Sequence, residues 1–461
     1  MTQTSKKSAF IATGLMLFAL FFGAGNLIYP PVLGQQAGQA VGAALAGFLL
    51  TGVGLPLAGV LAVAYTGLRD LQELAGRVGR VYGVLFAVAL YLAIGPLFAA
   101  PLTATVSFDI GIRPFLGGGE HKGLLAAFAA AFFALTYWLA ISPGKLVDRV
   151  GKVLTPALLV SIAVLVGYAA AKPMAALQVP SADYAANPVI KGLIEGYGTM
   201  DALASLVFAI IVIDAVRGMG FAKKEEVLYL TSRAGFVAVA FLALVYAFVA
   251  YMGAASVGEI GMQENGAAVL AKSAQYYFGT AGNVLLAVIV ILACLSTSVG
   301  LITACGEYFH RLAPRVSYRA WVTVFTLVSL ALANVGLSGI IKLSVPALML
   351  LYPLTVVLIA LAFLDRFFGG RRAVYACTVA ATLPVALIDG WRTAHGMFGG
   401  ASDGLIMRID AALKNILPLY ADGLGWVTPA AVGLAVGLAV TAAQGRAERP
   451  SLPFARNGKA V

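Results

Sequence analysis

Long apolar stretches recur along the whole chain, and short polar segments separate them. Each stretch has about 18 or more residues with few charges, which is the length a helix needs to cross a hydrocarbon core about 30 Å thick. A transmembrane β-barrel would show short alternating segments instead. The pattern predicts an all-α integral membrane protein with about 12 transmembrane helices. They lie near residues 8–31, 40–66, 82–107, 123–142, 150–171, 194–216, 233–255, 283–309, 319–335, 340–364, 373–391 and 424–443.

A glycine-rich interruption stands inside the first of these spans, where residues 21–31 read FFGAGNLIYPP. A break in a membrane helix frees backbone groups that lipid cannot satisfy, so protein, water or a bound solute must supply partners. Gly23 and Gly25 permit close approach of the backbone to a ligand, and Asn26 can cap the following half-helix. The positive end of that half-helix would suit a carboxylate. The competing interpretation is that the glycines only let another helix pack closely.

Composition and charge agree with a membrane protein. Of the 461 residues, 61% are hydrophobic and 11% are charged, which excludes a soluble globule of ordinary composition. The net charge of +11 does not indicate a nucleic-acid partner, because the basic residues sort by side of the predicted spans. Twenty-two of the 31 lie on one side, and the positive-inside rule places that side and both termini in the cytoplasm. The lipid bilayer is therefore the expected surrounding.

No polar linker is long enough to carry a soluble domain, so residues 1–461 are interpreted as a single transmembrane domain. A five-plus-five inverted repeat would give a first unit at 8–171 and a second at 194–364, with two extra helices within 373–443. In such transporters the first helix of each repeat is discontinuous, and the binding site lies near the midplane. The first span fits this pattern. The sixth fits less well, because its glycines flank residues 201–214 and do not interrupt them.

The sixth span carries two acidic residues, Asp201 and Asp214. A carboxylate at the bilayer centre costs about 2.5 to 3.5 kcal/mol on the insertion scale, so it favours a partner, water or a cation nearby. Asp201 is a candidate for gating or coupling, or else it caps or pairs locally near the interface. Asp214 stands close to Arg217 in sequence, and a salt bridge at the cytoplasmic end is expected there.

Three successive hydroxyl residues, Ser296, Thr297 and Ser298, lie inside the apolar eighth span. Sodium is a hard cation that prefers oxygen ligands. The hydroxyls of Ser296 and Thr297, a carbonyl at Ala293 and carbonyls released by the break in the first span could form a sodium site without a carboxylate. The alternative is that these hydroxyls bond back to carbonyls one turn earlier, as often happens in membrane helices.

Catalytic machinery is not evident. Three cysteines and three histidines are scattered, and they show neither a disulfide framework nor metal-ligand spacing. No nucleophile elbow or phosphate loop is present, so no catalytic residue is assigned and the chain is not expected to be an enzyme.

Several motifs together resemble one family. They are FALFFGAGNLI at 18–28, GPLF at 95–98, TATVSF at 103–108, TMD at 199–201, LACL at 292–295, and SVP at 344–346 with Tyr352-Pro353. Over nearly its whole length the chain resembles the bacterial branched-chain amino acid:cation symporters, the BrnQ carriers, which have the leucine-transporter fold. The resemblance implies a bacterial inner-membrane protein with five-plus-five topology and discontinuous first and sixth spans. Two positions depart from the pattern: Leu102, where arginine is common, and Asp214, where asparagine is common.

The resemblance further implies sodium-driven uptake of leucine, isoleucine and valine by alternating access. Ala24 and Gly25, between Gly23 and Asn26, would bind the amino acid's carboxylate and amine through backbone groups. Ser205 and Phe208 would face the substrate, with Phe208 closing over an aliphatic side chain. The sodium site would be formed by Ala19, Phe22, Ala293, Ser296 and Thr297.

Other functions remain open on the sequence. The same fold could carry another small neutral amino acid or a nucleobase, with sodium or protons as the coupling ion. An ion channel would need a filter loop or a ring of pore-lining residues, and no such motif is evident.

Overall fold

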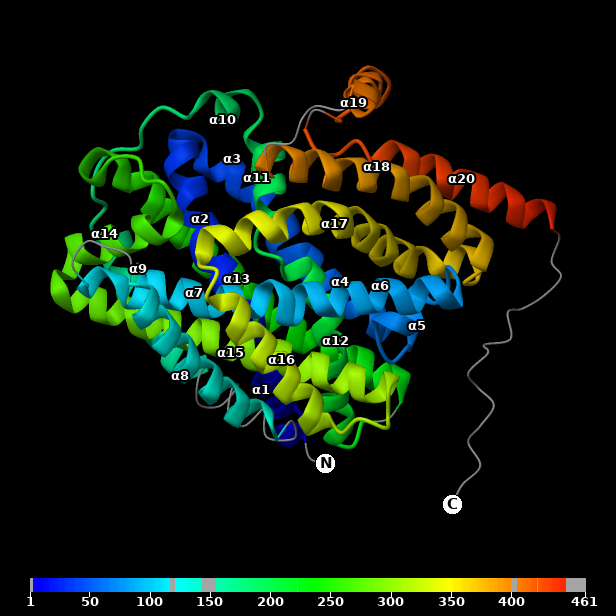
Figure 1. Cartoon of the computed structure of the whole chain (residues 1–461), viewed down its shortest axis with the longest axis horizontal. Helices are drawn as coiled ribbons and strands as arrows, with labels where there is room; N and C mark the ends of the chain where they lie inside the picture. The colour runs from blue at the N-terminus through cyan, green and yellow to red at the C-terminus, as the bar shows by residue number, and fades with distance from the viewer. Residues whose placement is uncertain are drawn as a thin grey trace.

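The computed structural model describes residues 3–116, 121–142, 155–221, 223–398, 404–420 and 422–444. All regular structure within these ranges is helical, as Figure 1 shows. The first half comprises α1 (Gln3–Phe21), α2 (Ala24–Ala37), α3 (Val41–Leu49), α4 (Leu55–Thr66), α5 (Leu71–Ala75), α6 (Arg80–Leu92), α7 (Ala99–Gly111), α8 (Lys122–Ala140), α9 (Thr155–Ala171), α10 (Ala182–Ala186) and α11 (Pro188–Tyr197). The second half comprises α12 (Asp201–Gly218), α13 (Lys224–Ile260), α14 (Gly266–Phe278), α15 (Thr280–Leu312), α16 (Tyr318–Ala333), α17 (Leu337–Phe368), α18 (Arg372–Phe398), α19 (Gly404–Ile416) and α20 (Val427–Ala443).

Each predicted span overlaps one or more of these helices, although the start of the predicted span 150–171 lies outside the described residues. In the described part of the chain, seven helical stretches are long and apolar enough to cross a membrane, and a bent pair raises the number to eight. Shorter apolar helices lie at Phe10–Phe21, Thr155–Ala169, Tyr318–Ala333 and Val427–Ala443. The fold is therefore that of a multi-helix membrane protein.

The expected interruption of the first span is present. Helix α1 ends at Phe21 and α2 begins at Ala24, so the break falls at residues 22 and 23. The two half-helices follow one another through the bundle, with α1 near the lower edge of Figure 1 and α2 near the top. Because a helix end leaves backbone groups without intrahelical partners, the break brings free carbonyls of α1 and free NH groups of α2 into the interior.

A second interruption separates α11 from α12. The two helices are bent by 45° at residues 198–200, and Met200 adopts a left-handed conformation with φ of 65°. The glycines flank residues 201–214 without interrupting them, as the sequence indicates, and the predicted discontinuity of this span lies just before them. The break follows Gly198 and directly precedes Asp201, so Asp201 is the first residue of the second half-helix.

A third irregularity lies between α6 and α7. Residues Ala93–Leu97 form a π-helical turn, in which Gly95 has φ of −86° and ψ of −114° and is followed by Pro96. A side chain at Gly95 would collide with Cys305 of α15, because an added Cβ would lie 2.2 Å from the Cys305 Sγ atom. This kink brings the start of α7 next to α15.

Small residues let the helices approach closely, as expected for membrane bundles. A Cβ at Gly34 of α2 would lie 1.9 Å from the carbonyl oxygen of Ala250 in α13, and one at Gly47 of α3 would lie equally close to Val189 of α11. Gly59 of α4 similarly makes room for Ser205 of α12. These contacts hold the broken helices against continuous ones.

Replacing Gly34 with alanine should destabilise the bundle. The added methyl group would force α2 and α13 apart, and overpacking of this kind costs about 1 to 3 kcal/mol. We expect a lower thermal unfolding midpoint for Gly34→Ala in detergent. The matched control is Gly42→Ala in α3, whose new methyl group would meet no atom within 4 Å. Equal midpoints for the two variants would contradict close packing at Gly34.

Candidate substrate and cation site

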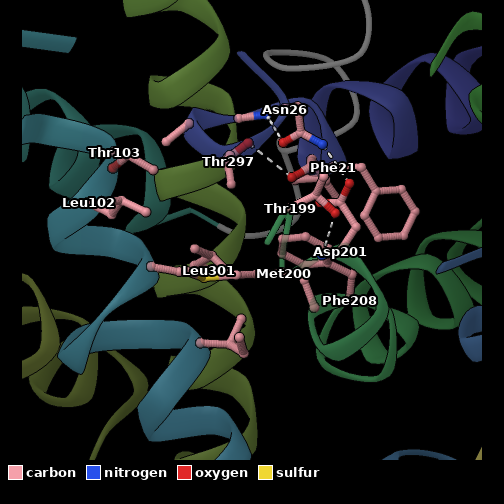
Figure 2. A pocket seen from close by; sticks show the side chains of 17 residues that line it. Phe21, Asn26, Leu102, Thr103, Thr199, Met200, Asp201, Phe208, Thr297 and Leu301 are labelled. Carbon is pink, nitrogen blue, oxygen red and sulfur yellow. Dashed lines mark hydrogen bonds between the residues drawn. The ribbon is translucent and has the colours of Figure 1, made fainter. Parts of the chain in front are cut away.

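A cavity of about 360 Å³, counting its space open to solvent, lies where the two helix breaks meet. Four parts of the chain line it: the first break, the start of α7, the second break with α12, and α15. Figure 2 shows Leu102 and Thr103 of α7 on one side and Asp201 and Phe208 of α12 on the other. The lining residues are Leu20, Phe21, Gly23, Ala24, Gly25, Asn26, Ile94, Ala99, Leu102, Thr103, Thr199, Met200, Asp201, Ala204, Phe208, Thr297 and Leu301.

The cavity has polar and apolar walls. Asn26, Asp201 and Thr199 supply polar groups at the two helix breaks. Aliphatic and aromatic side chains supply the rest, among them Phe208 and Leu301. Such a mixture, mainly apolar with a few placed polar groups, is typical of small-molecule sites. It suits a ligand with one charged end and one apolar end.

Asn26 joins the two breaks. Its Oδ1 atom accepts a hydrogen bond of 2.8 Å from the amide of Gly23, so the side chain caps α2 as the sequence predicted. Its Nδ2 group donates to the carboxylate of Asp201 at 2.5 Å and to the hydroxyl of Tyr246 in α13. The Tyr246 hydroxyl donates in turn to the same Asp201 oxygen over 3.1 Å. The start of α2 is thereby fixed to the start of α12.

The positions of the first break's glycines are compatible with both interpretations that the sequence left open. Gly23 and Gly25 line the cavity. They also allow close packing, because a Cβ at Gly23 would lie 2.7 Å from the hydroxyl of Thr297 and one at Gly25 would lie 3.0 Å from backbone atoms of Thr199. The close contacts are what bring the two breaks and α15 around one space.

The structure brings most of the sequence-predicted substrate residues to this cavity. Gly23, Ala24, Gly25, Asn26 and Phe208 all line it.

Ser205 is the exception among the predicted substrate residues, because it is not one of the residues that line the cavity. Its hydroxyl donates to the carbonyl of Ala202 over 2.6 Å, and its side chain stands against Gly59 of α4. In this conformation Ser205 contributes to helix packing.

A cluster of neutral oxygen atoms lies beside the cavity, between the end of α1 and the middle of α15. The Ser296 hydroxyl is 2.8 Å from the carbonyl oxygens of both Ala19 and Ala293. The Thr297 hydroxyl is 3.0 Å from the carbonyl oxygen of Leu20 and 3.4 Å from that of Ala19. Four predicted sodium-site residues, Ala19, Ala293, Ser296 and Thr297, are therefore neighbours in space.

The contacts of Thr297 separate the two interpretations of these hydroxyls. Its hydroxyl does not bond back within α15 but reaches across to α1, whereas Ser296 does both. The carbonyls that they contact belong to the last turn of α1, where the negative end of a helix dipole favours a cation. The arrangement is chemically suited to a hard cation.

The oxygen cluster differs from the predicted sodium site at Leu20 and at Phe22. The Leu20 carbonyl joins the cluster although the sequence did not single it out. For Phe22, the amide donates to the carbonyl of Phe18 over 2.7 Å, and its ring stacks on that of Phe18.

The donor set indicates the class of cation. Among the described residues no group of three or more His, Cys, Asp or Glu side chains could hold a metal ion. A cluster of carbonyl and hydroxyl oxygens without a carboxylate suits a monovalent hard cation better than a divalent one, since the divalent ions recruit carboxylates. The kind of donor atom thus favours a monovalent hard cation over a divalent one.

Asp214 forms the expected salt bridge, but with a different partner. Its carboxylate is 2.5 Å from the guanidinium of Arg311 at the end of α15, and it is not paired with the neighbouring Arg217 in any described contact. Arg311 also lies 3.9 Å from Asp70, which precedes α5, and from Glu307. Burial raises the pKa of the Asp70 carboxyl above its ordinary value. At this end of the bundle, Arg311 therefore links α15 to α12 and to the residue that precedes α5 through charged contacts.

Sequence reasoning missed several cavity residues. Thr103 and Ile94 line the cavity from α7 and the turn before it. Thr103 belongs to the motif at 103–108, which is a signal that could have placed it. Tyr246 lies in the middle of the 37-residue helix α13, and nothing in its local sequence distinguishes it from an interfacial or packing tyrosine.

Known proteins that are similar in sequence to this chain are described as branched-chain amino acid transporters. Residues 6–444 match the family model described as "Branched-chain amino acid transport protein". The branched-chain amino acid permease BraB of Bacillus subtilis is 46% identical over 431 residues, covering 94% of this chain and 95% of that protein. The branched-chain amino acid transport system 2 carrier protein of Pseudomonas aeruginosa is 44% identical, covering 93% and 95%. The BrnQ permease of Escherichia coli K12 is 36% identical, covering 97% and 98%.

Solved structures share the fold at low identity. Mhp1, described as a nucleobase-cation-symport-1 family transporter, matches in a closed conformation with a TM-score of 0.59 and 14% identity, covering 94% of this chain and 93% of that one. MhsT in complex with L-phenylalanine matches with a TM-score of 0.55 and 18% identity, covering 94% and 98%. Both have the leucine-transporter fold, as the resemblance implied. The chain is a multi-pass membrane transporter rather than an enzyme, and it belongs to the branched-chain amino acid transport protein family.

Proposed function

We propose that this protein is a sodium-coupled symporter that imports leucine, isoleucine and valine across the bacterial inner membrane by alternating access. The observation that carries the proposal is the meeting of two broken helices at one cavity, with a cluster of neutral oxygens at the end of α1. The choice of substrate rests on the relatives, which are branched-chain amino acid permeases and carriers.

The cavity supports an amino acid with an aliphatic side chain. The first NH groups of α2, at Ala24 and Gly25, have no intrahelical partner and lie at the positive end of the helix, where a carboxylate binds favourably. The side chain then extends toward Phe208 and Leu301, whose burial against it is favourable because apolar surface leaves water.

Thr297 supports coupling between the two ligands. Its side chain lines the cavity, and its hydroxyl contacts the carbonyls of the cation cluster. A cation that draws the end of α1 onto α15 would also order the wall that the substrate contacts. Each ligand then favours the same conformation, which is the thermodynamic requirement for coupling.

The proposal includes the architecture of such a carrier: about 12 spans, an inverted repeat with units at 8–171 and 194–364, and both termini in the cytoplasm. Two observations support it. The half-helices α2 and α12 each begin at a break and meet at one cavity. Phe10, in the first half of α1, lines a small pocket together with Val216 near the end of α12 and Leu230 near the start of α13, so these three parts of the chain lie close together.

The second candidate is a carrier for another small neutral amino acid or for a nucleobase, with sodium or protons as the coupling ion. The fold allows it, because Mhp1 with bromovinylhydantoin bound and MhsT in complex with L-phenylalanine share the fold. The aliphatic lining at Ile94 and Leu102 favours branched side chains. Competition by a panel of amino acids and nucleobases against labelled leucine separates the candidates.

Reconstitution tests the proposal directly. We expect proteoliposomes to accumulate labelled leucine when an inward sodium gradient is imposed and not when sodium is equal on both sides. Empty liposomes are the control. Uptake that follows a proton gradient and ignores sodium would refute sodium coupling while leaving leucine transport intact.

Thr297→Ala should weaken sodium dependence. The variant removes one oxygen from the cluster, and a polar contact with a charge is worth about 1.5 to 3 kcal/mol. We expect the half-activating sodium concentration for leucine uptake to rise about tenfold or more, with little change in the preference among leucine, isoleucine and valine. Thr326→Ala in α16 is the matched control, because Thr326 is buried and bonds only to Val322 of its own helix in the described contacts. An unchanged sodium activation curve would remove Thr297 from the cation site.

Phe208→Ala should weaken leucine binding. Loss of an apolar contact of this size is worth about 1 to 3 kcal/mol, so we expect a rise of several-fold or more in the dissociation constant for leucine. Phe325→Ala, a buried phenylalanine in α16 outside the cavity, controls for general loss of packing. Wild-type affinity in Phe208→Ala would exclude Phe208 from the pocket.

A further inference from the structure

Asp201 lines the cavity, and no basic side chain in the described part of the chain is paired with its carboxylate. Asp201 is only 3% exposed to solvent. Among the described residues no Lys, Arg or His forms a salt bridge with it, although several other acidic residues, such as Asp214 and Asp365, are paired with arginine. Its side-chain partners are the neutral groups of Asn26 and Tyr246. Among the described contacts, the Asp201 carboxyl group is therefore held inside the protein by hydrogen bonds from neutral groups.

When the Asp201 carboxyl group is ionised, it has no counter-charge among the described side chains. A carboxylate within a membrane-spanning region is costly, and such residues pair with one another, with backbone groups or with a transported species. Hydrogen bonds from two neutral donors orient the carboxylate, but they leave its charge uncompensated. A cation that enters the cavity would complete the site.

Asp201 does not serve simply as a cap for its own helix. Met200 occupies the capping position of α12 and makes no side-chain cap hydrogen bond, and the amide of Asp201 donates to the hydroxyl of Thr199 over 3.4 Å. Figure 2 shows the Asp201 side chain directed toward Asn26 at the start of α2. The two donors converge on a single oxygen, Oδ2, and so fix the direction of the carboxylate.

We infer that Asp201 is the receptor for the α-ammonium group of the substrate, a role that rests on the proposed function and assigns a residue to one end of the amino acid. Asn26 is the third residue of α2 and binds Asp201 directly, so this carboxylate lies within one turn of the α2 NH groups. An α-amino acid carries its ammonium and carboxylate on adjacent atoms. The α2 terminus and Asp201 line the same cavity, so they offer one partner to each charged group of such a zwitterion.

The assignment makes the site selective for zwitterions. An aliphatic acid without the ammonium would leave Asp201 buried and unpaired, and would place a second negative charge beside it. Asn26 and Tyr246 are positioning residues, because they hold Oδ2 and act on the substrate only through Asp201. Phe208 and the other apolar lining residues select the side chain independently of this charge pair.

Competition on the wild-type carrier provides the first test. Labelled leucine is displaced by unlabelled leucine, by 4-methylpentanoate, which lacks the ammonium, and by 3-methylbutylamine, which lacks the carboxylate. We expect 3-methylbutylamine to compete measurably and 4-methylpentanoate to bind at least about 100-fold more weakly than leucine. If 4-methylpentanoate competes as well as leucine does, the assignment is wrong, whatever any variant shows.

Asp201→Asn provides the second test, since it removes the charge and keeps the size and an acceptor oxygen. We expect the ratio of leucine affinity to 4-methylpentanoate affinity to fall at least about tenfold in this variant. A purely structural role would weaken both ligands alike and leave the ratio unchanged, which would overturn the assignment. Asp109→Asn is the matched control, because Asp109 pairs with Arg113 away from the cavity. Its ratio should equal that of the wild type.

Asp201→Glu keeps the charge and should retain a preference for leucine over 4-methylpentanoate. If Asp201→Asn does not fold, Asp201→Glu is measured in its place, and loss of its preference for leucine over 4-methylpentanoate would contradict the assignment. A variant Asp201→Asn that retains the ratio but loses the pH dependence of uptake would identify a proton site and refute the ammonium receptor. If wild-type protein binds no aliphatic amino acid at all, the proposed function itself fails, and this outcome is distinct from an unchanged ratio in a carrier that binds leucine.

Discussion

The hydrogen bond between Asn26 and Asp201 joins two half-helices that would otherwise end inside the bundle without partners. Backbone groups freed in a membrane must be satisfied by protein or by a ligand, and this constraint governs the centre of the molecule. Asn26 caps α2 through Gly23 and at the same time reaches α12 and Tyr246 of α13. One amide side chain therefore fixes how the two broken helices face each other, and the cavity exists because they are held in this way.

The free ends of the first break point to different kinds of ligand. The last carbonyls of α1, at Ala19 and Leu20, meet the hydroxyls of α15. Ala24 and Gly25, which carry the first NH groups of α2, line the cavity on the other side of the break. Because the two ends differ in the sign of their partial charge, one interruption can hold a cation and an anion group a short distance apart. Close packing at Gly23 keeps Thr297 between them.

Many residues at the helix breaks and the cavity could be predicted from local sequence. The exceptions all depend on contacts between helices that are far apart in the chain. The break at Gly23, the cap at Asn26 and the hydroxyls at 296 and 297 all have local signals. Ser205 and Tyr246 do not. Their roles depend on which helix faces them, since Ser205 stands against Gly59 of α4 and Tyr246 reaches a residue 220 positions earlier. The partner of Asp214 is similar, because Arg311 lies 97 positions away while Arg217 is close in sequence.

The sequence by itself determined that this chain is a helical membrane protein, where its first span is interrupted, and to which family it belongs, because hydropathy, glycine and local motifs act over a few residues. The tertiary structure alone decided that the second interruption lies directly before Asp201, that Leu20 joins the oxygen cluster, and that Asp201 faces Asn26 with no basic side chain paired to it among the described residues. These features arise from contacts between helices distant in the chain, and the packing of whole helices sets them.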